Sequence, residues 1–425
     1  MAMWWRMRCS CCQWRANPED SLSKQRYFRW KQLPVMQIHL FMLFVLAAPV
    51  LGEEAGAGAQ ARAAVQRSLP YLEKISTAWM REKKCNSCHT VTFLLWTYNE
   101  AAAHGLQVDR QKLEEWTNWS LADALGDHYW FRLRPRAMEA LKAGGIPDSL
   151  LAKLKPVAAK TYTKESDYVG ALEKALGAED LERHREILMR VATLPNNGGG
   201  PDTLAQLMLG RAAKTEDAAT TKSYKAIGSL LLEWQEPDGS WMTQGQLPEI
   251  KWGEKEMNEA TTLWGILATS SVNSPDEKLT QCRQRALESL RNASPGGSVQ
   301  SLALHALVAH LLGDQAKADA LLKKLVGRQN ADGGWGWLED NKTSEAFSTG
   351  QALYALGRLG HTMTDPVVMR AWEFLLRTQG ADGGWDVPQQ AVNRRPRKLN
   401  VYPYWGSAWA AIGLLQTLPD VAVKR

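Results

Sequence analysis

The chain is poor in cysteine, in phenylalanine and in net charge. It has 6 Cys, 7 Phe and a formal net charge of +6 over 425 residues. Residues 1–52 alone carry +5, which leaves +1 for the rest and excludes a basic face for nucleic acid. Only Cys85, Cys88 and Cys282 follow residue 52, too few to form a disulfide scaffold.

Long hydrophobic runs are also missing. The apolar stretch Ile38–Leu51 follows a basic segment, and its 14 residues fall short of the ~20 that a membrane-spanning helix needs. Small residues at Val50 and Gly52 fit a cleavage site. We therefore predict that residues 1–52 are a signal peptide and that the body is periplasmic or extracytoplasmic. An uncleaved membrane anchor is the alternative, and translation could start at Met36.

Tryptophan, by contrast, is abundant, with 19 residues. Much of it belongs to a repeated turn in which Gln precedes Asp-Gly and then Trp, at residues 235–241, 329–335 and 379–385. Asp can bond its own backbone and Gly can adopt the left-handed conformation that ends a helix. Residues 293–297 and 196–200 look like eroded copies. The pattern predicts that the Trp folds back over a helix end, with the Gln amide bonding free backbone groups.

The segments between these turns have the periodicity of helices. Leu304, Leu307, Val308 and Leu311 recur at intervals of three and four and so share one helical face. A repeat of 40–50 residues with two helices per unit must stack on its neighbours to bury these faces. The sequence therefore predicts an all-α fold of helical hairpins.

The Gln-to-Trp turns resemble the QW motifs of terpenoid cyclases, notably the C-terminal half of squalene–hopene cyclase, and the repeats of protein prenyltransferase β subunits. The resemblance is strongest from about residue 220 to 418. It implies an α/α toroid around a central cavity that binds an apolar or isoprenoid small molecule. We expect a helical segment at 53–160 and the main toroid at 161–425, joined as one ring.

The catalytic groups that the resemblance implies are missing. No Asp-x-Asp-Asp acid motif occurs, and the nearest acids, Glu339-Asp340, follow a turn at a position typical of a loop. Leu399–Ser407 holds neither Cys nor His, so zinc is not expected. Several aromatic residues either line the cavity, where they could stabilise a cation, or pack as core: Trp264, Phe347, Tyr404, Trp405 and Trp409. No catalytic residue is assigned.

Cys85-Asn86-Ser87-Cys88-His89 has the form of a c-type haem attachment site. Two thioether bonds would hold one haem c, and His89 would ligate its iron. A local disulfide, a redox-active cysteine pair and a zinc site are the alternatives. The redox pair would need a βαβ setting, which the helical pattern here does not provide.

The motif lies between two expected helices, 71–81 and 90–105. We predict that a haem turn replaces the QW turn of the first hairpin and lies at the same rim of the ring as Trp335 and Trp385. The second axial ligand is left open. The sequence offers Met138, His128 and His104, or an iron with an open position.

The leading hypothesis is an exported haem c protein that transfers electrons to a redox partner protein, or supports a redox step on an apolar molecule. One alternative is a cyclase-like isomerase without the usual acid motif. Another is a haem-free binding scaffold. The sequence does not decide whether the protein is an enzyme.

Overall fold

The computed structural model describes residues 35–83, 86, 90–126, 129–160, 162, 164–195, 200–212, 217–243, 253–271, 277–388 and 401–419. Contacts divide the chain into Met1–Gly52 and Glu53–Arg425. None of the described helices combines the length and hydropathy required to span a bilayer. Export and cleavage of residues 1–52 stay predictions.

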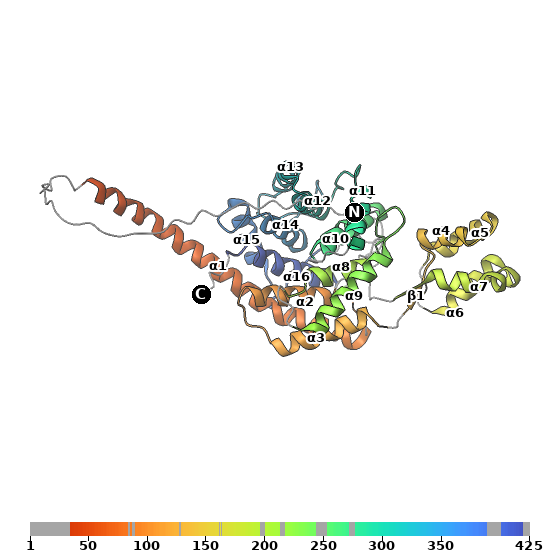
Figure 1. Cartoon of the computed structure of the whole chain (residues 1–425). Helices are drawn as coiled ribbons and strands as arrows, with labels where there is room; N and C mark the ends of the chain where they lie inside the picture. Colours follow the sequence, from red (N-terminus) through yellow and green to blue (C-terminus); the bar gives the residue numbers. More distant parts are fainter. Residues whose placement is uncertain are drawn as a thin grey trace, which may run out of the picture. The chain divides into compact units, whose positions relative to one another are not determined.

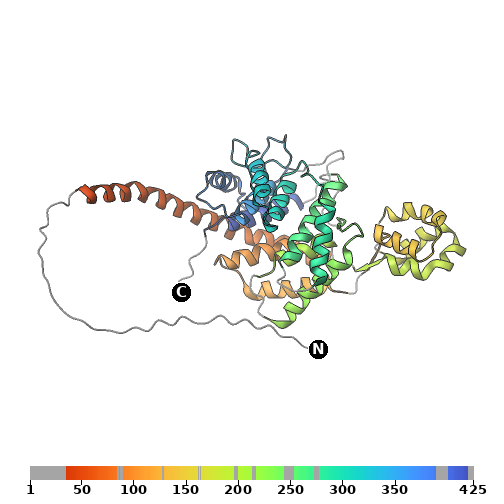
Figure 2. The same cartoon turned by 45° about the horizontal axis from the view of Figure 1, so that its top comes forward.

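The body is an α/α toroid whose inner layer consists of helices buried on nearly all sides. In α12, for example, every residue from Val299 to Ala309 is buried, as expected for a helix that is apolar all round. Each inner helix contacts the next, and the last returns to the first, so that the described helices close a ring (Figures 1 and 2). In ring order they are α2 (Val91–Ala103), α8 (Pro201–Leu209), α10 (Glu254–Ser270), α12 (Val299–Leu311), α14 (Ala346–Arg358) and α16 (Val401–Gln416).

The outer layer consists of amphipathic helices that each bury one face against the inner ring. In α15 the buried residues Val368, Ala371 and Trp372 follow helical spacing. The members of this layer are the part of α1 (Val35–Lys83) that follows Gly52, together with α3 (Arg110–Ala124), α9 (Ala218–Trp234), α11 (Glu277–Ser289), α13 (Gln315–Val326) and α15 (Pro366–Thr378). The chain alternates between the two layers, as stacked hairpins require, which confirms the predicted fold class.

An insertion with a core of its own separates α3 from α8. It runs through β1 (Tyr129–Phe131), α4 (Pro135–Ala143), α5 (Asp148–Ala158), α6 (Glu165–Leu176), α7 (Ala178–Ala192) and β2 (Thr193–Pro195), and its helices group together in Figure 1. The strands pair antiparallel, with Trp130 opposite Leu194, and so tie the two ends of the insertion together. Its core is centred on Leu141, Leu154 and Tyr168. Neither the strands nor this second core was predicted from the sequence.

A buried ion pair links the insertion to the toroid. Arg134, just before α4, lies 3.4 Å from the carboxylate of Glu236, and the two side chains are 7% and 2% exposed. The guanidinium also lies 4.8 Å from the ring centroid of Trp234. Burial lowers the pKa of Arg134 and raises that of Glu236, and each charge partly offsets the shift of the other.

The three Gln-to-Trp turns use the same hydrogen bonds, as the sequence predicted. Asp332 accepts from the Gly334 N–H at 3.1 Å, which forms the expected Asx-turn. The indole N–H of Trp335 donates to the Leu325 carbonyl, at the end of the preceding helix, at 2.8 Å. Trp241 and Trp385 repeat this bond at 2.8 Å, to Leu231 and Leu375.

The glutamine of each turn also holds the next outer helix. The Gln329 amide donates to the carbonyls of Gly333 and Val367, each at 2.8 Å, and its oxygen accepts from Arg370 on α15. Gln235 contacts Cys282 and Arg285 on α11 in the same way. In the last turn, Gln379 donates to the Ala64 carbonyl at 2.8 Å and accepts from Arg67, both on α1. The final turn therefore closes the outer layer on the first helix.

Candidate functional site

The segment between α1 and α2 connects an outer to an inner helix, as the Gln-to-Trp turns do. Cys85, Cys88 and His89 lie outside the described residues, but Asn86 between them is described and is 0% exposed. Its side-chain amide donates to the Ser120 carbonyl at 3.2 Å, and its backbone N–H donates to the Asp123 carboxylate at 2.5 Å. The residue within the motif is thus anchored on α3.

The start of α2 lies beside the start of α16. The Tyr404 hydroxyl donates to the carbonyl of Thr90, the N-cap of α2, at 2.7 Å and lies 2.6 Å from the hydroxyl of Ser76 on α1. Burial raises the pKa of Tyr404, so its hydroxyl stays protonated and able to donate. Trp385 bonds to α16 about one turn further along, since its backbone N–H donates to the Ser407 hydroxyl at 2.8 Å. Thr90, the described residue next to the motif, therefore lies near the rim of the ring that holds Trp385.

The three candidates for the second axial ligand lie in different parts of the chain. His104 follows α2, at the end opposite Thr90, and 14 residues of helix separate them by about 20 Å. Met138 is half-buried in α4 and packs against the core of the insertion. His128 lies outside the described residues. The described helices therefore do not bring His104 close to the motif.

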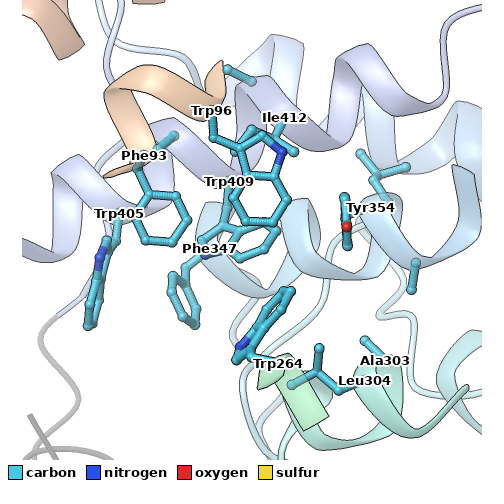
Figure 3. Close-up of a cluster of buried hydrophobic side chains, with 14 of the residues drawn as sticks. Phe93, Trp96, Trp264, Ala303, Leu304, Phe347, Tyr354, Trp405, Trp409 and Ile412 are labelled. Atoms are coloured by element: carbon cyan, nitrogen blue, oxygen red, sulfur yellow. The ribbon is translucent and has the colours of Figure 1, made fainter. Parts of the chain in front are cut away.

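Aromatic side chains pack together in the interior of the inner ring. Trp409 on α16 is 2% exposed, and its ring centroid lies 5.6 Å from that of Trp96 on α2 and 5.9 Å from that of Trp264 on α10 (Figure 3). Its other ring contacts are with Phe93 at 5.4 Å and Tyr354 at 5.6 Å. Edge-to-face and stacked pairs of this kind add to the stabilisation from burial.

Four of the five aromatic residues singled out in the sequence belong to this region: Trp264, Phe347, Trp405 and Trp409. Tyr404 does not, because its hydroxyl bonds to α1 and to the start of α2. Of the two alternatives, Tyr404 follows core packing, since it is fully buried between α16, α1 and the start of α2. For the other four, the observed ring contacts favour packing over the lining of an open cavity.

Buried polar side chains link neighbouring inner helices. Each of four contacts joins side chains on two adjacent helices: Thr92 to Gln206 at 2.9 Å, Asp202 to Thr261 at 2.5 Å, Glu259 to His305 at 2.7 Å and Gln300 to Gln351 at 3.1 Å. Buried polar groups need such partners, so these pairs fix how the inner helices meet. None of the four pairs was predicted from the sequence, because their members are 46 to 114 residues apart.

Neither acid proposed as a stand-in for a cyclase acid is buried. The side chain of Glu339 is 74% exposed and pairs with Arg328 at 3.0 Å, and Asp340 is exposed beside it. Among the described residues, no three His, Cys, Asp or Glu side chains gather as a metal site would require.

Glu100, near the end of α2, is a further acid in a desolvated position. Burial raises its pKa, with Trp96, Arg358 and Gln416 only partly offsetting the shift. A carboxyl group whose pKa is higher in the folded than in the unfolded state stabilises the fold at pH values below its unfolded-state pKa. This contribution is lost as the pH rises through the folded-state pKa. We therefore expect Glu100→Gln to melt at a higher temperature than wild type at pH 8.

The advantage of Glu100→Gln should shrink as pH falls to about 4, where the free carboxyl also becomes protonated. Thermal unfolding followed by circular dichroism across this range measures it. Glu114→Gln, an exposed change on α3, provides the matched control and should follow wild type at every pH. A Glu100→Gln protein that is less stable at pH 8 would mean that Arg358 outweighs the burial.

Comparison with known families connects the turns to the cyclases. Residues 298–385 match the family model of the squalene-hopene cyclase N-terminal domain. The match begins at the N-cap of α12, ends on Trp385 and includes two of the three turns. It supports a terpenoid-cyclase-like toroid, although the matching domain is the N-terminal one and not the C-terminal half that the sequence suggested.

Solved structures of a glycosidase, in its wild-type form and two single-residue variants, match with 11%, 10% and 11% identity and TM-scores of 0.42, 0.43 and 0.43. Each comparison covers 84% of this chain and 98% of the other. Similarity at this level carries no argument about activity. No curated protein sequence matches the chain.

Proposed function

We propose that this chain is a c-type haem protein on a cyclase-like toroid, with one haem joined to Cys85 and Cys88 and with His89 as an axial ligand. The observation that supports it most is the place of the motif in the chain. It occupies an outer-to-inner connection, and Asn86 within it is buried against α3. Two thiols three residues apart beside an imidazole are the donor set that such a haem needs.

The surrounding residues suit a fixed ligand. Asn86 and Asp123 would restrain the segment, and α2 begins two residues after His89. The positive end of a helix dipole disfavours a protonated imidazole nearby, and iron requires the neutral form. When bound, the haem would supply a one-electron couple.

Within this proposal, electron transfer is favoured over a redox step on a large apolar guest. The aromatic side chains around Trp409 fill the part of the ring where such a guest would sit. A redox partner protein and an extracytoplasmic location go with the proposal, since bacterial haem attachment to such motifs takes place outside the cytoplasm.

Covalent haem is tested by expressing the whole chain together with haem-attachment machinery. We expect an intact mass one haem above the bare polypeptide and a peroxidase-active band after denaturing electrophoresis. Cys85→Ala combined with Cys88→Ala should abolish both signals. A colourless wild-type protein with the bare mass would refute the proposal.

Cys282→Ala is the matched control for the cysteine changes. Cys282 is 0% exposed on α11, and burial raises the pKa of its thiol to about 11, so this thiol should not react with haem. Its replacement should leave the haem signals intact.

A haem-free binding scaffold is the second candidate and fits the toroid comparably. The exposure of Glu339 and Asp340 favours it over a cyclase, which needs a buried acid. Incubation with squalene should yield no cyclised product. Formation of such a product would restore the cyclase alternative.

A further inference from the structure

A pocket of about 470 Å³ lies between outer helices α11 and α13, beside inner helices α10 and α12. Pockets of this size commonly hold small molecules. None of its lining residues belongs to the α1–α2 connection or to the aromatic cluster around Trp409. It is therefore a separate site from the proposed haem site. Its apolar walls are formed by Leu263, Leu287, Leu290, Val308, Ala309 and Leu312.

His305 is a polar side chain in the wall of this pocket and is only 5% exposed. Its protonation follows from its neighbours. The Ser301 hydroxyl accepts from the backbone N–H of Gly296 at 2.8 Å and donates its own proton to the Glu259 carboxylate at 3.1 Å. The same carboxylate oxygen lies 2.7 Å from Nε2 of His305. Because a carboxylate only accepts, Nε2 carries the proton, and Nδ1 of the neutral ring carries a lone pair.

This lone pair on Nδ1 of His305 is an acceptor without a donor. None of the described residues donates a hydrogen bond to it. Glu259 and Ser301 do not line the pocket, so the Nε2 side of the ring is directed away from it. The ring edge opposite Nε2 is the one that carries Nδ1. Buried acceptors normally have partners, and the pocket is where a donor can reach this one.

The charged residues around the pocket balance one another. Arg291 and Glu288 pair at 2.5 Å. Asp314 accepts from the backbone N–H of Lys317 at 3.1 Å, and the Lys317 side chain is exposed. Two acids and two bases leave no net charge. An ionic ligand would lose its hydration here without an excess of opposite charge to replace it, so a neutral ligand is favoured.

We propose that this pocket binds a neutral alcohol with an apolar chain. The hydroxyl of the alcohol donates to Nδ1 of His305. The chain covers the apolar walls, including Leu312, which is 55% exposed in the absence of a ligand. A single polar group in a mostly apolar wall is the usual means by which such a site orients its ligand. The proposal does not depend on the presence of haem.

Isothermal titration of the full chain with octan-1-ol and with its isomer 1-methoxyheptane tests the role of the hydroxyl. The two probes have the same atoms, but the ether cannot donate a hydrogen bond. We expect saturable binding of the alcohol, about three- to tenfold tighter than that of the ether, which is the effect of one neutral hydrogen bond. Octanoate and octylammonium should bind more weakly than the alcohol. Equal binding of alcohol and ether, or tighter binding of either ion, would overturn the proposal.

His305→Phe removes the acceptor and keeps an aromatic ring in the wall. The variant should lose the preference for octan-1-ol over 1-methoxyheptane while it still binds the ether as wild type does. A preference that persists in this variant would show that the hydroxyl bonds elsewhere and would refute the assignment of His305.

Gln284→Trp tests the location of the site without touching the core. Gln284 is exposed on α11 and lines the pocket, so an indole there should weaken binding of both probes about tenfold or more, with an unchanged circular dichroism spectrum. Gln281→Trp is the matched control, because Gln281 is exposed on the same helix and does not line the pocket. Binding that survives Gln284→Trp, or that Gln281→Trp weakens equally, would place the alcohol outside this pocket.

Discussion

Trp409→Ala is expected to lower the free energy of unfolding by about 3–5 kcal/mol, the range for truncating a buried large aromatic side chain. Its ring contacts four other aromatic rings from α2, α10 and α14. Neighbours held by separate helices cannot all move inward to fill the space, so a cavity should remain. Chemical denaturation followed by circular dichroism measures the loss.

Trp119→Ala is the matched control, because Trp119 is only half-buried on the outer helix α3. We expect a loss of about 1 kcal/mol or less from this change, as is usual for partly exposed positions. If Trp409→Ala were no more damaging than this control, the centre of the ring would be able to collapse around the missing indole, and the cluster would not be tightly packed.

Gly333→Ala should be strongly destabilising, because the added methyl combines a backbone penalty with a collision. Gly333 has φ of +91°, and an added Cβ would lie 2.1 Å from the backbone oxygen of Arg370 on α15. Positive φ alone costs an alanine roughly 1–2 kcal/mol, and the collision should add about 1–3 kcal/mol. Thermal and chemical unfolding give the total.

Gly360→Ala separates the two contributions. Gly360 also has φ of +91°, but an added Cβ would meet no atom within 4 Å. Its replacement should therefore show only the backbone penalty. Equal losses at the two positions would mean that α15 shifts away at little cost, and the contact between turn and helix would then contribute little to the stability of the ring.

The turns were predictable because their chemistry is local. Asp-Gly specifies the turn whatever the rest of the chain does, and the Gln and Trp bond to groups that any helix end exposes. Even an eroded copy was recognisable, since residues 293–297 do connect α11 to α12. The insertion was not predicted, because α4 to α7 are amphipathic like the outer helices. The pairing of β1 with β2 and the separate core set them apart, and both depend on residues far apart in sequence.

The side chains of the site were harder to predict. In α16 nearly every residue is buried, so no polar stripe marks which side faces the centre. Tyr404 and Trp405 are neighbours in sequence but point about 100° apart around the helix, and periodicity could not tell them apart. His305 went unnoticed because Glu259 is 46 residues away. The available signal was Ser301 and His305, polar residues one helical turn apart in a helix that is mostly apolar.

The contact of the final turn with α1 has a consequence for biosynthesis. Ser76 and Tyr404 meet across 328 residues of sequence, and Ala64 and Gln379 across 315. While the ribosome is still elongating the chain, α2 lacks one of its two lateral neighbours and presents an apolar flank. Completion of the structure must wait for the last segment to emerge, so nascent chains and C-terminally truncated products should be clients for chaperones.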